Sequence, residues 1–342
     1  MLIGLTVSPT TARQESDALV LGVSHVGLTV RDLEASAALY RESAHLAEVA
    51  RGPLEEALVQ ALAGSGSTVQ TRLLASSNVQ VRLMQVGAGS ATAGRPHDAE
   101  ASGASEAVPV NGPGMAHLCY QSDGDLETYQ KFVARGAQPL GNPELVVLNP
   151  RNPVVYAYAL DRDGVMFEVE HIDVAAAPER TPPAGFHRIR HLSLATPDME
   201  RALAFYPVLL DNPKPRRLGG DQGLQGEPFD QVSGLPGTRI QMAWFQVGNL
   251  ELEIVHYLSH PPQDPSGPRP LSAPGYNMVV FDVADLDAAK ERLRSAGGEP
   301  VSETLAIEGG EIFFGRDPDQ NLLGFAVLDE ESILSSQRFA KP

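Results

Sequence analysis

Apolar and polar residues alternate in the stretch VSHVGLTV at residues 23–30. Apolar positions 26, 28 and 30 fall on one side of this two-residue period, and His25, Gly27 and Thr29 fall on the other, which predicts a strand with two unlike faces. Asp32 follows, and aspartate is favoured before a helix because its carboxylate accepts a free backbone N–H of the first turn. The pattern therefore predicts a strand with a histidine on its polar face, followed at once by a capped helix.

The same pattern occurs four times along the chain. The strand residue and its capping aspartate are His25 and Asp32, His117 and Asp125, His191 and Asp198, and Asn277 and Asp285. Their separations are 7, 8, 7 and 8 residues. This alternation predicts a pair of unlike modules that has been duplicated, each module reading strand, helix and then two or three further strands.

Changes in composition divide the chain. The expected segments, in order, are an arm at 1–20, an N-terminal domain at 21–174, a Pro-rich linker at 175–185, a C-terminal domain at 186–330 and an exposed tail at 331–342. Each domain is expected to hold two modules joined by a Gly-, Ser- and Pro-rich linker, at 87–113 and at His260–Pro274.

Finer patterns predict local elements in the first two modules. They indicate helices at 33–46, 54–63 and 126–135, and strands at 69–75, 79–86, 154–160 and 165–171. The last two strands should form a hairpin, because the turn between them contains Asp163-Gly164.

Composition limits the class of protein. With 342 residues, 42% hydrophobic and 20% charged, the chain is long enough for about two soluble globular domains. Its net charge of -17 argues against nucleic acid, whose phosphates would repel it. The single cysteine, Cys119, lies in an apolar strand and allows neither an internal disulfide nor a cysteine metal cluster. The chain lacks a long apolar run and a signal-peptide pattern, so we expect no membrane association and a cytoplasmic location.

A single module is too small to bury both faces of its sheet, so we expect modules to pair. Helices would cover one face of each sheet, and the face with the polar strand positions would curl around a shared cavity. The expected fold class is α+β.

At this point the chain resembles the vicinal oxygen chelate superfamily, which includes glyoxalase I, methylmalonyl-CoA epimerase, extradiol dioxygenases and fosfomycin- and bleomycin-resistance proteins. The resemblance rests on HVGLTVRDL from His25, on DRDGVMFE at Asp161–Glu168 and on DPDQNL from Asp317. It covers nearly the whole chain and implies four βαβββ modules paired into two half-barrel domains.

The resemblance also implies metal ligands on the first and last strands of each module. Carried over to this sequence, the N-terminal domain offers His25, Arg82, His117 and Glu168. His25, His117 and Glu168 are the expected ligands, because two imidazoles and one carboxylate form the facial triad of non-haem Fe(II) oxygenases. Fe(II) is therefore the expected metal, and Mn, Ni, Co or Zn is also compatible.

The C-terminal domain offers His191, Glu253, Asn277 and Gly324, and it is interpreted as a degenerate site. Glu170 shares a strand face with Glu168, so the carboxylate ligand is ambiguous by two residues.

Three further residues are candidates for catalysis. Tyr158 lies ten residues before Glu168, as in extradiol dioxygenases, and could contact a bound phenolate or enolate oxygen. Arg82 could bind an anionic substrate, or it could pair with Glu168 or Glu170 and replace the metal. His97, in the first linker, is the candidate acid or base.

Three functions remain open from the sequence. The first is Fe(II)-dependent dioxygenation of a catechol-like or other bidentate oxygen substrate. The second is a glyoxalase-like lyase or epimerase that works through an enediolate, although Arg82 stands where a fourth ligand is expected. The third is a non-catalytic protein that binds a small molecule. All three imply a small-molecule partner, and a homodimer is compatible with each.

Overall fold

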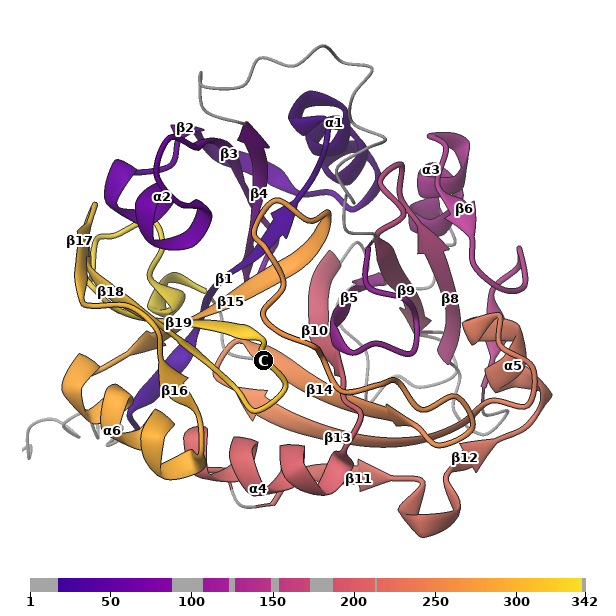
Figure 1. The fold of residues 1–342 in the computed structure, drawn as a ribbon. Helices are drawn as coiled ribbons and strands as arrows, with labels where there is room; N and C mark the ends of the chain where they lie inside the picture. Colours follow the sequence, from indigo (N-terminus) through magenta and orange to yellow (C-terminus); the bar gives the residue numbers. More distant parts are fainter. Residues whose placement is uncertain are drawn as a thin grey trace, which may run out of the picture.

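The computed structural model describes residues 18–87, 107–122, 127–148, 154–172, 187–212 and 214–339. Four modules follow one another, and each begins with a strand that leads toward a helix (Figure 1). The first module contains β1 (Val20–Thr29), α1 (Leu33–Ser43), β2 (Ala47–Pro53), α2 (Glu56–Ala63), β3 (Thr68–Ala75) and β4 (Gln80–Gly87). The second contains β5 (Gly114–Ser122), α3 (Glu127–Ala134), β6 (Gln138–Pro139), β7 (Val146–Val147), β8 (Val154–Leu160) and β9 (Met166–Ile172).

The second half of the chain repeats this order. The third module contains β10 (His187–Ala195), α4 (Met199–Leu209), β11 (Arg216–Leu218), η3 (Gly220–Gln222), β12 (Leu224–Gln225), α5 (Glu227–Ser233), β13 (Arg239–Val247) and β14 (Leu250–Tyr257). The fourth contains β15 (Gly275–Val283), α6 (Leu286–Ala296), β16 (Glu299–Pro300), β17 (Leu305–Ile307), β18 (Gly310–Arg316), β19 (Leu322–Leu328) and η4 (Ser336–Arg338). The expected α+β fold of four modules in two half-barrels is confirmed.

The predicted helix caps are present where the structure describes them. The side chains of Asp32, Asp198 and Asp285 each accept a hydrogen bond from the backbone N–H three residues later, at 3.0, 3.0 and 2.7 Å. The fourth expected cap, Asp125, lies outside the described residues. Helix α1 ends at Ser43, before the expected end at residue 46, and β2 occupies residues 47–53, where the sequence predicted no element. Strand β2 gives little hydrophobic signal because it is the edge strand of its sheet and none of its residues is buried.

The two sheets join the modules in an order that the sequence did not indicate. One sheet runs β16-β18-β19-β15-β1-β4-β3-β2 and combines the first and fourth modules. The other runs β11-β13-β14-β10-β5-β9-β8-β6 and combines the second and third. We call them the 1–4 half-barrel and the 2–3 half-barrel. Each half-barrel therefore takes one module from each of the expected domains at 21–174 and 186–330.

Helices and turns explain this pairing. Tyr40 on α1 donates a hydrogen bond to Asp161 in the β8–β9 turn, at 2.8 Å, and Tyr206 on α4 donates to Asp317 in the β18–β19 turn, at 2.6 Å. Helix α1 contacts α3, and α4 contacts α6 (Figure 1). Consecutive modules thus pack through helices and turns, which leaves their first strands to pair with strands from the other part of the chain.

The apolar strand faces form one core beneath these helices. Val26, Leu28 and Phe167 belong to the same buried cluster as Phe281 and Phe325, so the core includes residues from both half-barrels. Burying strand and helix faces together supplies the main driving force for this arrangement. The opposite strand faces carry the polar residues and border the cavities described below. No helix in the described ranges is long and apolar enough to cross a membrane.

The end of the chain differs from the expected exposed tail at 331–342. Leu334 and Ser336 are buried, and both the backbone N–H and the hydroxyl of Ser336 donate to Asp282 at 2.8 Å. Gln80 on β4 donates to the carbonyl of Ile333 at 2.6 Å. The chain up to residue 339 therefore packs on the 1–4 half-barrel. The arm at 1–17 and the linker at 175–185 lie outside the described residues.

Candidate metal centre

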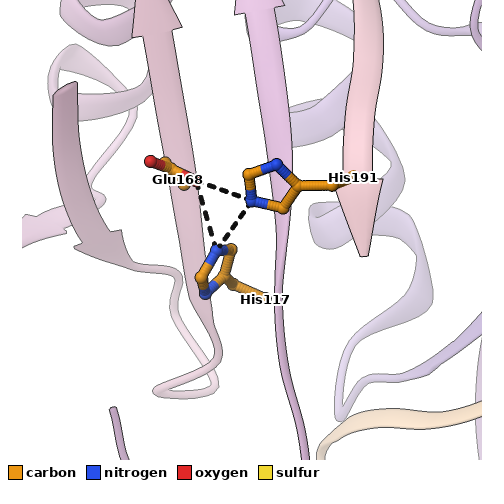
Figure 2. A group of neighbouring side chains, drawn as sticks. All are labelled: His117, Glu168 and His191. Carbon is orange, nitrogen blue, oxygen red and sulfur yellow. Dashed lines mark hydrogen bonds and ion pairs between the residues drawn. The ribbon is translucent and has the colours of Figure 1, made fainter. Parts of the chain in front are cut away.

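Three side chains from three strands meet in the 2–3 half-barrel. His117 lies on β5, Glu168 on β9 and His191 on β10, and Figure 2 shows their polar ends directed toward one another. The Nε2 atoms of the two histidines are 3.2 Å apart, and Glu168 Oε2 lies 3.2 Å from His117 Nε2 and 2.9 Å from His191 Nε2. Parallel pairing of β5 with β9 and antiparallel pairing of β5 with β10 create this convergence.

A second carboxylate approaches the same point. Glu253 on β14 has its Oε2 atom 3.7 Å from His117 Nε2 and 3.5 Å from His191 Nε2. Each of the four residues is at most 5% exposed. Two imidazoles and two carboxylates are thus gathered in a nearly dry site, where an uncompensated charge would be costly.

The spacing fits a divalent cation. A cation held by imidazole nitrogen and carboxylate oxygen lies about 2.1 Å from each donor, so neighbouring donor atoms are roughly 3.0 to 3.5 Å apart. The distances from the two histidine Nε2 atoms to each other and to the carboxylates, 2.9 to 3.7 Å, are close to this range. The Nδ1 atoms of His117 and His191 are buried without a hydrogen-bond partner among the described residues, so Nε2 is the atom that each ring directs to the cluster.

Electrostatics within the cluster favour opposite charges. Burial tends to raise the pKa of Glu168, but hydrogen bonds from His117 and His191 outweigh it and hold that pKa far below its usual value. Burial tends to lower the pKa of His191, whereas Glu253 and Glu168 raise it, and the net direction is upward. Glu168 therefore remains ionised and draws positive charge into the site.

A cavity of about 740 Å³ leads to this cluster and is lined by Glu168, His191 and Glu253. Tyr158 on β8 also lines it, and its ring centroid lies 5.0 Å from that of His117. Burial raises the pKa of Tyr158 well above its usual value, so its hydroxyl keeps its proton at neutral pH and can donate a hydrogen bond.

The third module supplies much of the remaining wall. Phe229 and Val232 on α5 and Leu224 on β12 give it apolar surface, and Arg216 on β11 stacks on Trp244 at 4.0 Å. No element was predicted in this region, because short strands and a seven-residue helix produce no sustained hydrophobic period.

A family model of the Glyoxalase/Bleomycin resistance protein/Dioxygenase superfamily matches residues 22–169 and 188–325. The chain belongs to this superfamily. Both matched parts contain two modules, in agreement with the duplication seen in the sequence.

Curated relatives in this superfamily include epimerases. The ethylmalonyl-CoA/methylmalonyl-CoA epimerase of Cereibacter sphaeroides is 29% identical over 140 residues, which cover 39% of this chain and 91% of that protein. Human mitochondrial methylmalonyl-CoA epimerase is 23% identical over 134 residues, which cover 39% of this chain and 68% of that protein.

Solved structures share the fold over nearly the whole chain. Glyoxalase I from Zea mays has a TM-score of 0.57 at 16% identity, covering 90% of this chain and 92% of that one. A putative dioxygenase from Bacillus subtilis has a TM-score of 0.57 at 10% identity, covering 95% of this chain and 93% of that one.

The superfamily ligands that the sequence indicated are only partly brought together. His117 and Glu168 lie together, but His25 lies on β1 in the 1–4 half-barrel, and the second histidine beside them is His191. The sequence assigned His191 and Glu253 to a degenerate C-terminal site, whereas the structure places His191 beside Glu168 and Glu253 near both histidines. The reason is the module pairing, because β5 pairs with β10 and not with β1.

Glu170, the alternative to Glu168 as carboxylate ligand, is paired with an arginine. Arg190 forms an ion pair with Glu170 and lies 3.2 Å from Glu251, and Gln121 donates to Glu170 at 2.7 Å. Glu170 is therefore bound by Arg190 and Gln121 and not by the histidines. Arg82, which the sequence suggested as the partner of Glu168 or Glu170, lies on β4 in the 1–4 half-barrel. His97 lies outside the described residues.

Proposed function

We propose that this protein is a metal-dependent lyase or isomerase that removes a proton from a carbon next to a carbonyl group and proceeds through an enediolate or enolate. The observation that carries the proposal is the position of Glu253, whose carboxylate lies 3.7 Å from His117 Nε2 and 3.5 Å from His191 Nε2, next to the group of His117, Glu168 and His191. A divalent cation at this cluster would supply positive charge that stabilises the oxygen of the enolate.

The number of ligands distinguishes the two enzyme classes. A six-coordinate metal with three protein ligands has three vacant coordination positions, enough for a bidentate substrate and O₂. With four protein ligands it has two vacant positions, and a bidentate substrate fills both. Four converging donors thus favour enolate chemistry over the dioxygenation that the sequence suggested first.

The residues have separable roles in this proposal. Glu168 lies within hydrogen-bond distance of both histidines, whereas Glu253 is more than 3.4 Å from each. Glu253 is therefore the carboxylate better able to leave the cluster and accept a substrate proton. Tyr158 would donate a hydrogen bond to a developing oxyanion in the cavity.

The epimerase relatives support this class of substrate. Their names indicate an acyl-CoA thioester as substrate, and such a compound has an acidic carbon beside its carbonyl. The open, partly apolar cavity of about 740 Å³ and the guanidinium of Arg216 are compatible with a large anionic substrate.

Dioxygenation remains the second candidate because one observation favours it. His117, His191 and Glu168 alone form a two-histidine, one-carboxylate group, and Tyr158 lies beside them.

Deuterium exchange tests the proposal. Protein loaded separately with Co(II), Ni(II), Zn(II), Mn(II) or Fe(II) would be incubated in D₂O with methylmalonyl-CoA and ethylmalonyl-CoA, and mass spectrometry would follow deuterium at the carbon between the carbonyls. We expect exchange with at least one metal, its loss in Glu253→Gln, and retention of both metal and exchange in the control His25→Ala. Oxygen uptake with catechol by the Fe(II) form, without exchange by any form, would instead support dioxygenation.

A further inference from the structure

The two half-barrels enclose very different amounts of space. In the 1–4 half-barrel, apolar side chains such as Leu58 and Leu334 leave only a narrow recess beside His25. The 2–3 half-barrel holds the cavity of about 740 Å³ that leads to the metal centre. A substrate therefore has room beside the metal ligands, and the rest of the cavity wall determines which substrates fit there.

Three arginines line one part of this wall. They are Arg188 and Arg190 on β10 and Arg216 on β11, and we call them the arginine group. Arg190 directly precedes His191, and both residues line the cavity because the register of β10 against β5 shifts at this point. The reaction proposed above gives neither Arg188 nor Arg190 a role, so their presence in the wall needs another explanation.

Strand register places the arginine group on one side of the metal centre. Glu170 lies two residues after Glu168 on β9, and Glu251 lies two residues before Glu253 on β14. Because β9 runs parallel to β5 and β14 runs antiparallel to it, both steps lead in the same direction, by about 7 Å. Arg190 forms ion pairs with both Glu170 and Glu251. The arginine group thus begins one such step beyond the metal ligands.

The cavity wall becomes polar in this direction. The β13 residues that line the cavity are, in chain order, Ile240, Met242, Trp244 and Gln246. Trp244 is opposite Glu253 of the metal centre, and Gln246 is opposite Glu251 beside the arginine group. The apolar residues of β13 therefore lie before the metal centre and a polar one lies beyond it. A ligand that extends from the metal toward the arginines enters the polar end of the cavity.

Ion pairs and stacking hold two of the guanidiniums in place. Arg190 lies between Glu170 and Glu251, and Arg216 lies 3.3 Å from Glu251 and 4.0 Å from the centre of the Trp244 ring. These contacts restrict the side chains before any ligand arrives. A guanidinium that is already oriented binds a planar anion at a lower entropic cost.

Arg188 adds a third positive charge to this end of the cavity. Its Nε–H donates to the amide oxygen of Gln121 at 2.6 Å, and the amide of Gln121 donates to Glu170 at 2.7 Å. Burial, and then repulsion by Arg190, lower the pKa of Arg188. Among the described residues that line this end, three guanidiniums thus accompany two carboxylates, and the other two carboxylates of the wall face the metal position. One negative charge on a ligand would balance the excess.

We propose that the substrate carries a distal carboxylate, which binds to Arg188 within the arginine group while the reacting oxygens bind at the metal centre. This inference rests on the function proposed above, because both concern the same cavity. The carboxylate lies about 7 Å or more beyond the metal ligands, two strand residues or more along the wall. A carboxylate on the reacting carbon itself is too close to reach the arginines, so the group recognised here is a separate one at the far end of the substrate.

Hydroxamates test this subsite, because their two oxygens bind a divalent metal as the oxygens of an enediolate would. Co(II)-loaded protein would be titrated with the monohydroxamates of succinic, adipic and suberic acid, and with the same compounds bearing a terminal amide in place of the carboxylate. Calorimetry would give the affinities, and the Co(II) absorption spectrum would report coordination. We expect the acid to bind about tenfold or more tightly than the amide in the adipic or suberic pair, the difference expected for one charge-assisted interaction.

Variants assign this preference to a residue. Arg188→Gln should lose the preference for the acid, and Arg188→Lys should keep part of it. The matched control is Arg217→Gln, because Arg217 also lies near the cavity on β11 but is exposed and pairs with Glu200. This control should bind every hydroxamate as the wild type does. A preference that Arg188→Gln retains in full would overturn the role of Arg188.

Failure of this inference can be told apart from failure of the proposed function. If no hydroxamate changes the Co(II) spectrum, the metal centre and the subsite are both overturned. If the spectrum changes but acid and amide bind equally at every chain length in the wild type, only the subsite is overturned, even if Arg188→Gln fails to fold. Tighter binding of a terminal phosphonate than of the carboxylate would overturn the choice of a carboxylate.

Discussion

His191 and His25 occupy equivalent strand positions, yet in the described part of the chain only His191 lies near a second histidine and two carboxylates. Both side chains are at most 3% exposed, so burial does not distinguish them. What distinguishes them is the neighbouring strand, which supplies Glu253 to His191 and Arg82 to His25. The same residue type in the same local pattern therefore has opposite electrostatic surroundings.

Replacing either histidine should show this difference. We expect His191→Ala to weaken binding of a divalent metal by at least about a hundredfold, the upper end of the loss seen for ligand-supporting residues. His25→Ala should keep wild-type metal stoichiometry, measured by elemental analysis after dialysis. Loss of metal in His25→Ala and retention in His191→Ala would contradict the assignment.

Tyr158→Phe tests the proposed hydrogen bond to the oxyanion. The substitution keeps the ring beside His117 and removes only the hydroxyl, so we expect metal content to be retained and kcat to fall about a hundredfold, the lower end of the loss for an oxyanion donor. Steady-state kinetics would measure the effect. An unchanged kcat would show that the hydroxyl takes no part in the reaction.

Turns and helices hold consecutive modules of this fold together. Asp161 and Asp317 occupy equivalent hairpin turns, and each accepts a hydrogen bond from a helix tyrosine of the preceding module. Burial raises the pKa of both aspartates to about 6, although hydrogen bonds to each oppose the shift. These elements explain why consecutive modules remain together although their sheets are shared with other modules.

The raised pKa values predict a pH dependence of stability. Between about pH 4 and pH 6 the folded state holds protons on Asp161 and Asp317 that the unfolded state has lost, so these groups make the protein less stable as pH rises through that window. The loss should be up to about 3 kcal/mol for each group.

Asn substitutions isolate this effect. Relative to Asp161→Asn or Asp317→Asn, the wild type should lose free energy of unfolding from pH 4 to pH 6 in urea titrations. Tyr40→Phe removes a hydrogen bond that lowers the pKa of Asp161 and should move the transition to higher pH. A difference between wild type and variants that does not change with pH would refute this account.

At the scale of the whole molecule, the metal centre joins the two parts of the chain. His117 and Glu168 precede the Pro-rich segment at 175–185, and His191 and Glu253 follow it. A ligand bound only by the folded state stabilises that state, by about 4 kcal/mol when its free concentration is a thousandfold above its dissociation constant.

Metal removal should therefore loosen strands from both parts of the chain. We expect chelation to lower Tm and to reduce amide protection in β9 and β14, while β4 in the 1–4 half-barrel changes less. Hydrogen exchange followed by mass spectrometry measures this, and His117→Ala should show the same pattern without a chelator. Equal loss of protection in β4 would indicate general destabilisation.

The sequence by itself determined the modules of this protein. Strand alternation and aspartate caps are local, so the four repeats, three of the helix starts and the superfamily could be inferred, together with His117 and Glu168. Only the tertiary structure decided which modules share a sheet, and with it that His191, and not His25, lies beside His117 and Glu168, with Glu253 near both histidines. All four first strands carry similar patterns, and their pairing depends on packing contacts, such as Tyr40 with Asp161, between residues far apart in the chain.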